Sequence, residues 1–158
     1  MSVRKKVFLG LLVVFFLIQF IRPEKNVSAA PAPNDLFANY QAPDSVERLV
    51  KTACYDCHSN NTVYPWYGEV QPVAWWLNDH VQEGKNELNF NEFATYAPKK
   101  GDHKLEEVIE MVEKGEMPLK SYSLIHRNAR LSDTQRKTMA DWAKGIRKEM
   151  QSDIKKAY

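Results

Sequence analysis

The stretch Cys54-Tyr55-Asp56-Cys57-His58 decides what the rest of the chain folds around. Two thiols three residues apart, followed at once by an imidazole, are typical of sites where haem is attached covalently. On a helix this spacing places both sulfurs on one face, where each can bond to one vinyl group of the same porphyrin. The imidazole of His58 would then be the proximal iron ligand. The motif therefore predicts one covalent haem c with its iron.

A Cys-x-x-Cys pair has two other interpretations, half of a zinc site or a redox-active dithiol. A structural zinc site takes four ligands, but the chain has two cysteines only, and His80, His103 and His126 are too scattered to form a second pair. A thioredoxin-like dithiol would follow a buried strand, whereas the residues before Cys54 have helical periodicity. The pattern favours haem over these two alternatives.

The net charge excludes one class of partner. The chain carries +2, but residues 1–29 hold five of the 22 basic groups and one of the 20 acidic groups. The remainder has 17 basic and 19 acidic groups, a net charge of −2. A nucleic-acid partner would call for a strong basic surplus on one face, so none is expected.

Residues 1–29 have the pattern of an export leader. Three basic residues, Arg4, Lys5 and Lys6, precede an apolar run over residues 7–21, and Val27-Ser28-Ala29 offers a small-residue cleavage site. The run is shorter than the roughly 20 residues of a spanning helix, which favours a cleaved signal peptide. The alternative is an uncleaved membrane anchor. Either form predicts a periplasmic domain, soluble after cleavage or tethered to the inner membrane.

The rest of the chain divides into three parts. Residues 30–43 are rich in Ala, Pro and Asn and lack apolar periodicity, which predicts an extended, mobile linker. Residues 44–150 form the expected c-type haem-binding domain, and residues 151–158 a tail. About 130 residues after the leader suit one domain with one core.

Apolar residues at helical spacing predict an all-α domain. The expected helices run from Asp44 to the motif and over residues 72–84, 102–114 and 132–150. Gly115 should end the third, and Ser132 with Gln135 should form a capping box on the fourth. The fourth helix is expected to pack on the first. Residues 89–100 and 121–129 are expected to be irregular.

Four residues are candidates for the haem pocket. Trp66 and Tyr67 follow the motif in an aromatic loop, and Trp76 and His80 share the apolar side of the helix over residues 72–84. Aromatic groups fill protein cores with or without a cofactor, so ordinary core packing is the competing interpretation. The backbone carbonyl that accepts the Nδ1 proton of His58 is sought near Pro65 or Pro72.

Met117 is the candidate distal iron ligand. It follows the helix end at Gly115 and precedes Pro118, so it sits on a short, restricted loop that could hold a thioether toward iron. Direct ligation by His80 and an open sixth position are the alternatives. His103 and His126 are expected at the surface.

The chain resembles the bacterial haem-binding domain family over roughly residues 36–150. The resemblance rests on blocks that occur in order: Cys54-Tyr55-Asp56-Cys57-His58-Ser59-Asn60, Tyr64-Pro65-Trp66-Tyr67, Pro72-Val73-Ala74-Trp75-Trp76-Leu77, Leu88-Asn89-Phe90 and Met117-Pro118-Leu119. This family consists of small exported c-type haem proteins. More distantly, the order of helix, motif, Met-Pro loop and terminal helix resembles single-haem cytochromes c. The resemblance implies a small cytochrome c-like helical domain around one covalent haem.

The leading functional hypothesis is electron transfer by this haem in the cell envelope, with envelope redox proteins as partners, rather than an enzyme activity. A second hypothesis is a haem enzyme or sensor with an open or His80-lined distal site, acting on peroxide or binding a diatomic gas. A third is a redox-silent haem domain that serves as an interaction module.

Overall fold

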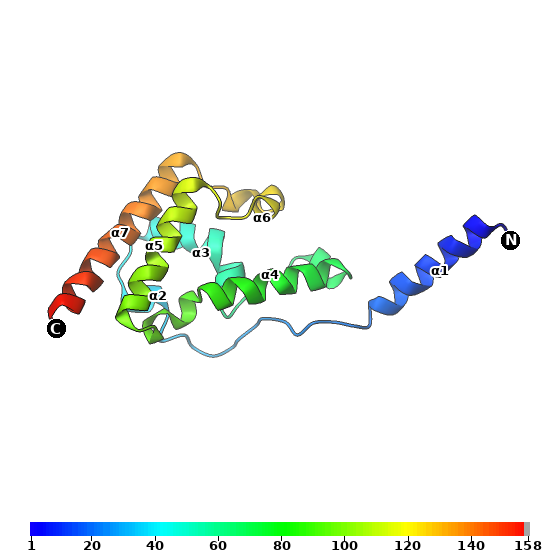
Figure 1. Cartoon of the computed structure of the whole chain (residues 1–158), viewed down its shortest axis with the longest axis horizontal. Coiled ribbons are helices and arrows are strands. Elements are labelled where there is room, and N and C mark those ends of the chain that lie inside the picture. The colour runs from blue at the N-terminus through cyan, green and yellow to red at the C-terminus, as the bar shows by residue number, and fades with distance from the viewer. Residues whose placement is uncertain (157–158) are drawn as a thin grey trace.

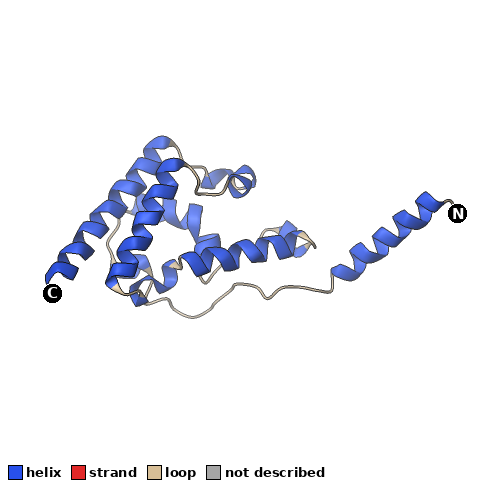
Figure 2. Cartoon of the chain, viewed as in Figure 1, coloured by secondary structure: helices blue, strands red, loops and turns tan. Residues whose placement is uncertain are grey.

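The computed structural model of the 158-residue chain describes residues 1–156. Within that range the chain is helical, without a named strand, and the all-α class is confirmed (Figure 2). In chain order the elements are α1 (Val3–Ile18), α2 (Leu36–Asn39), α3 (Asp44–His58), η1 (Trp66–Glu69), α4 (Val73–Glu87), η2 (Phe90–Thr95), α5 (Pro98–Lys114), α6 (Lys120–Ile125), η3 (Arg127–Ala129) and α7 (Asp133–Lys156). An isolated antiparallel bridge pairs the backbones of Val27 and Asn61.

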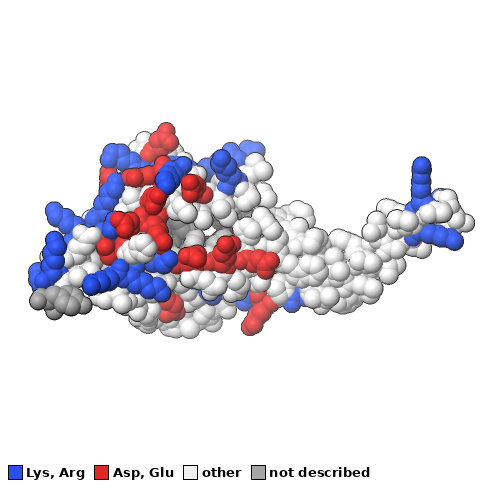
Figure 3. Space-filling view, viewed as in Figure 1, with Lys and Arg blue, Asp and Glu red and all other residues white. Residues whose placement is uncertain are grey.

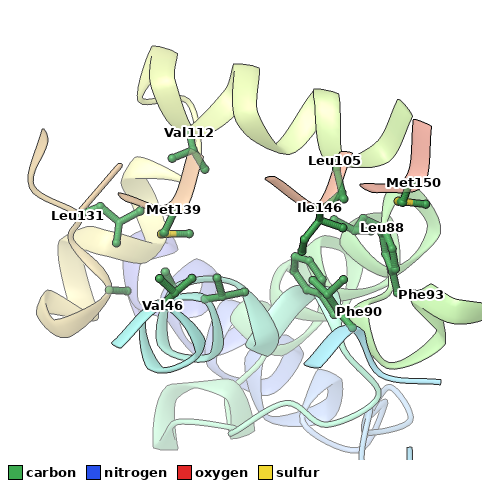
Figure 4. Close-up of a cluster of buried hydrophobic side chains, with 14 residues drawn as sticks. Val46, Leu88, Phe90, Phe93, Leu105, Val112, Leu131, Met139, Ile146 and Met150 are labelled. Atoms are coloured by element: carbon green, nitrogen blue, oxygen red, sulfur yellow. The ribbon is translucent and has the colours of Figure 1, made fainter. Parts of the chain in front are cut away.

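The core lies where α3, α5 and α7 meet. α5 and α7 run antiparallel, side by side, and α3 packs behind them (Figure 1). Each helix contributes apolar side chains at helical spacing, which is why the periodicity of the sequence located these helices. The buried cluster contains Val46, Leu88, Phe90, Phe93, Leu105, Val112, Leu131, Met139, Ile146 and Met150 (Figure 4). The expected packing of the terminal helix on the first domain helix is confirmed.

The end of α5 and the start of α7 lie where the sequence predicts them, because neighbouring residues determine both. Gly115 ends α5 in the left-handed conformation with φ of 73°, which a residue without Cβ adopts at little cost. The backbone N–H of Ser132 donates to Gln135 Oε1 at 2.8 Å, and the Gln135 N–H donates to Ser132 Oγ at 3.3 Å. The predicted capping box at the start of α7 is therefore confirmed.

The predicted end of α4 at Gly84 is wrong, because the helix continues to Glu87. Gly84 lies against the motif instead. A Cβ built on Gly84 would stand 2.7 Å from the carbonyl oxygen of Cys57, closer than real Cβ contacts allow. The glycine is therefore a point of close backbone approach between α3 and α4 rather than a helix stop.

The predicted start of α5 at Asp102 is also wrong. The helix begins at Pro98, a residue suited to the first turn. Asp102 lies inside the helix and pairs with α7, because Arg147 Nε and Nη2 donate to its two carboxylate oxygens at 2.8 and 3.2 Å. This bidentate pair joins two neighbouring helices and leaves Asp102 no role as a cap.

The segment predicted as a mobile linker over residues 30–43 is in part ordered within the fold. Leu36 is fully buried in the core cluster, at 0% exposed. Asp35 caps α2 by accepting from the Phe37 N–H, and its other oxygen accepts from Tyr55 and Asn91. Of the predicted tail over residues 151–158, the part up to Lys156 continues α7, and the last two residues lie outside the described residues.

The N-terminal helix α1 lies apart from the helices of the core, at the far end of the molecule (Figure 1). None of its side chains is buried. Lys and Arg side chains gather at its N-terminal tip, and the rest of its visible surface is uncharged (Figure 3). Among residues 1–156, no helix combines the length and the apolar character needed to cross a membrane.

Candidate functional site

The motif, residues 54–58, forms the C-terminal end of α3. Cys54 and Cys57 are one turn apart in the helix, both are partly buried, and neither is in a disulfide. His58 is the last residue of α3. The helix therefore presents both thiols on one side and places the imidazole beside them.

His58 is held by the C-terminal end of α4. Its Nδ1 lies 3.0 Å from the carbonyl oxygen of Leu88. The prediction that the acceptor lies near Pro65 or Pro72 is wrong, because the close approach of α4 at Gly84 brings the Leu88 carbonyl to the imidazole instead. With the proton on Nδ1, the lone pair lies on Nε2, which is the arrangement of a metal-ligating histidine.

The surroundings of His58 favour its neutral form. Burial lowers its pKa below the ordinary value, and hydrogen bonds to the carbonyls of Leu88 and Gly84 offset only part of that effect. A protonated imidazole cannot donate a lone pair to a metal. The imidazole of His58 is therefore neutral at neutral pH, with a lone pair available for a metal.

α6 is joined to the motif through Tyr122. The Tyr122 hydroxyl donates to Asp56 Oδ2 at 2.6 Å, and Asp56 is one of the two residues between the cysteines. Burial and this hydrogen bond raise the pKa of Tyr122, so the hydroxyl keeps its proton. The prediction of irregular structure over residues 121–129 is wrong, because this segment forms α6 and η3 beside the motif.

His126 is half-buried, so its predicted surface position is wrong. Its ring stacks on Tyr122 with centroids 4.2 Å apart, and its Nε2 lies 2.7 Å from the hydroxyl of Tyr67. Tyr67, a predicted pocket residue, therefore connects η1 to the residue that directly follows α6. The spacing of Tyr122 and His126, four residues apart, is the signal in the sequence that would have placed them on one helix face.

The other candidate pocket residues lie at the surface of η1 and α4. Trp66 is 81% exposed and contacts Tyr67 edge-on. Trp76 is also exposed, and its ring lies 4.4 Å from that of His80, centroid to centroid. His80 Nδ1 is 2.9 Å from the backbone oxygen of Trp76, which again leaves the lone pair on Nε2. His103 is exposed beside two glutamates, as expected.

Met117 lies in the short loop between α5 and α6, with its side chain half-buried. Its backbone is held on both sides: the N–H donates to the carbonyl of Met111 at 3.2 Å, and the carbonyl accepts from Arg136 Nη1 at 2.8 Å. The same guanidinium nitrogen donates to the carbonyl of Val112 at 3.0 Å. Arg136 therefore ties this loop to the end of α5.

These residues fit a haem. Two thiols and a neutral imidazole could supply two attachment points and one axial ligand, and a porphyrin would bring its own iron and its own four nitrogen ligands. Among residues 1–156, no three His, Cys, Asp or Glu side chains gather as a metal site of their own. Large apolar side chains on the elements beside the motif, Trp66, Trp76, Leu124 and Ile125, are exposed to solvent. An apolar cofactor of this size would cover such side chains.

A hollow of about 400 Å³ on the outer side of α5 and α7 is not this site. Charged side chains such as Glu110, Lys114 and Lys144 line it together with Ile109. No residue of the motif and no predicted pocket residue borders it. The volume of this hollow is therefore not evidence for or against haem binding.

Both thiols should react slowly in the folded, haem-free protein. Burial raises the pKa of Cys54 to about 12, with a contribution from Cys57, and raises that of Cys57 to about 11, with a contribution from Asp56. Alkylation by iodoacetamide needs the thiolate, so at pH 9 we expect it to be about fiftyfold slower at Cys57 and about five-hundredfold slower at Cys54 than in the urea-unfolded chain. Equal rates in the two states would contradict the burial of the thiols.

The same shifts determine how pH affects stability. The pKa values of both thiols are higher in the folded state than in the unfolded chain. The stability that the buried, protonated thiols contribute is therefore complete below pH 9 and is lost as the pH rises through about 11 and 12. Urea unfolding of the haem-free protein at pH 8 and pH 10.5 should show the lower stability at the higher pH.

Of the comparisons with known proteins, the one with family models gave a match. A comparison with curated proteins gave no match, and neither did a comparison with solved structures. The family model described as haem-binding domain matches residues 13–145, which includes the motif, the aromatic blocks and Met117. Because the match covers most of the chain, the chain belongs to the haem-binding domain family.

Proposed function

We propose that this haem-binding protein is a single-haem c-type electron carrier of the bacterial cell envelope. The observation that carries the proposal is the geometry of the motif. Cys54 and Cys57 lie one turn apart at the end of α3, and the Nδ1 of His58 is bound to a backbone carbonyl. Such an arrangement serves covalent attachment and proximal ligation together.

Each residue of the site has a proposed task. Cys54 and Cys57 would hold one haem c by thioether bonds, and Nε2 of His58 would bind its iron. Bound haem supplies one-electron chemistry between the ferric and ferrous states. Trp66, Tyr67, Trp76 and His80 are proposed to line the pocket and to limit the access of water. Burial and hydrogen bonding by these groups would tune the reduction potential.

Met117 is proposed as the distal ligand because its loop is restrained. The loop is closed by the hydrogen bond from Met117 to Met111 and by the two bonds from Arg136. A restrained backbone reduces the entropy lost when the thioether binds. A thioether stabilises ferrous iron relative to a second imidazole, which suits a carrier of fairly high potential.

The proposed location is the periplasmic side of the inner membrane. The basic tip and apolar run of the first 29 residues support export, either as a cleaved signal peptide or as a tether. Other envelope redox proteins are the proposed electron donor and acceptor, and no nucleic-acid partner is proposed.

A second candidate function is a haem enzyme or gas sensor with an open distal side. It is favoured by the hydrogen-bonded pair of Tyr67 and His126, polar groups of the kind that distal pockets use for peroxide or diatomic ligands. His80, whose Nε2 carries the lone pair, could serve the same purpose.

Optical spectra of the ferric and ferrous protein, with and without carbon monoxide, test the proposal. We expect reversible one-electron reduction and no spectral change with carbon monoxide, because both axial positions would be filled. Carbon monoxide binding to the ferrous form would contradict the carrier and support the second candidate. Failure to cycle between the two oxidation states would favour the third hypothesis, a redox-silent haem domain that serves as an interaction module.

A further inference from the structure

The chain between α1 and α2 is bound to the rest of the domain by hydrogen bonds. Residues 19–28, named here the strap, begin with a turn at 19–20, continue without helix from residue 21 and pass along α4 (Figure 1). The strap ends at the predicted cleavage site, Val27-Ser28-Ala29. Its contacts with the haem-binding domain therefore decide whether a chain cut at that site could keep its fold.

Asn26 is the centre of these contacts and is 7% exposed. Its side-chain Nδ2 donates to the carbonyl of Ser59 and to Thr62 Oγ1, both at 2.9 Å. Its Oδ1 accepts from Lys85 Nζ at 2.6 Å. Its backbone N–H donates to the Tyr64 hydroxyl at 2.8 Å, and its carbonyl accepts from the Thr62 N–H at 2.9 Å. Every polar group of this buried asparagine is thus bonded to the domain.

A second set of contacts holds the start of the strap. Gln71 is 1% exposed, and its N–H donates to Gln19 Oε1 at 2.9 Å. The Gln71 side chain and the Trp75 indole both donate to the carbonyl of Ile21, at 2.9 and 2.8 Å. Without the strap, the buried amide of Gln71 would lose these protein partners. Arg22 and Lys25 also pair with Glu69, but such exposed ion pairs add little.

The strap also bears on the haem site. Ser59, whose carbonyl Asn26 binds, directly follows His58, and Thr62 donates its hydroxyl proton to the carbonyl of Asp56 at 2.6 Å. The strap therefore stabilises the turn that leaves the motif. At its far end the backbone of Val27 pairs with Asn61, and the Ser28 N–H donates to Asn61 Oδ1 at 2.7 Å.

We propose that residues 19–28 are a permanent part of the mature haem-binding domain, so the chain is not cut at Val27-Ser28-Ala29 and keeps its N-terminal helix. The inference rests on the proposed export of the chain but not on electron transfer. Of the two forms considered for the exported domain, it selects the one that retains its leader.

The mass of the intact mature protein is the direct test. The full chain is expressed in a bacterial host that attaches c-type haem, and holoprotein is recovered from both the soluble and the membrane fraction. A holoprotein that still carries α1 ahead of the strap supports the proposal. One that has lost α1 overturns it. Reversible reduction of the same samples tests electron transfer separately.

A matched pair of variants tests whether the strap is docked. In Asn26→Ala, amide hydrogen exchange at Thr62 should accelerate about tenfold, which corresponds to about 1.4 kcal/mol of lost local stability. Asn128→Ala, at an exposed asparagine of η3, should leave that rate unchanged. The Asn26→Ala holoprotein should also melt about 3 °C lower or more. Equal exchange at Thr62 in the two variants would overturn the proposal even if the leader is retained.

Discussion

Replacing Cys57 with alanine should leave the mature protein with one thioether bond to haem, and replacing both Cys54 and Cys57 should leave none. The chain contains no other cysteine, so no other sulfur can replace them. After denaturation and extraction with acidic organic solvent, haem should stay with the wild-type and single-variant polypeptides and leave the double variant. The mass of each denatured protein and the spectrum of its haem report the number of bonds.

Thr52→Ala is the control for this series, because Thr52 is a half-buried residue of the same helix outside the motif. It should keep both bonds. The double variant should lose nearly all holoprotein, since noncovalent haem would depend on His58 and on the apolar side chains alone. Haem that leaves the wild-type polypeptide in the acidic solvent would show that attachment is not covalent.

Replacing Met117 with alanine should remove the sulfur-to-iron charge-transfer band of the ferric protein and open the ferrous protein to carbon monoxide. The reduction potential should fall by an amount of the order of 0.1 V, a fraction of the roughly 0.8 V over which axial ligands set haem potentials. The physical reason is that a thioether stabilises ferrous iron, and its loss leaves water or no ligand in its place. Absorption spectra and a redox titration measure both effects.

Met111→Ala is the matched control, because Met111 is an exposed methionine six residues earlier on α5. It should keep the charge-transfer band and the potential. If the wild type lacks the band and His80→Ala is the variant that opens the site, then His80 is the distal ligand. In that case Met117 only fills space in the loop between α5 and α6.

The sequence alone was sufficient for features that depend on neighbours within a few residues. The spacing of Cys54, Cys57 and His58 predicts its chemistry without a fold, and the family match agrees with the binding of haem. The left-handed glycine at Gly115 and the Ser132 and Gln135 capping box follow from local backbone chemistry. Apolar periodicity located the helices of the core for the same reason, since positions three and four apart share a helix face.

Only the tertiary structure shows which residues far apart in the sequence contact one another. His58 bonds to Leu88, thirty positions away, and His126 to Tyr67, fifty-nine positions away. Gly84 is a residue type that often ends a helix, but here it is the point where α3 and α4 make close backbone contact. Asn26 lies in a stretch that reads as the end of a leader, yet it is buried against Ser59 and Thr62. Such pairs depend on how helices pack over long separations, and no local propensity encodes that packing.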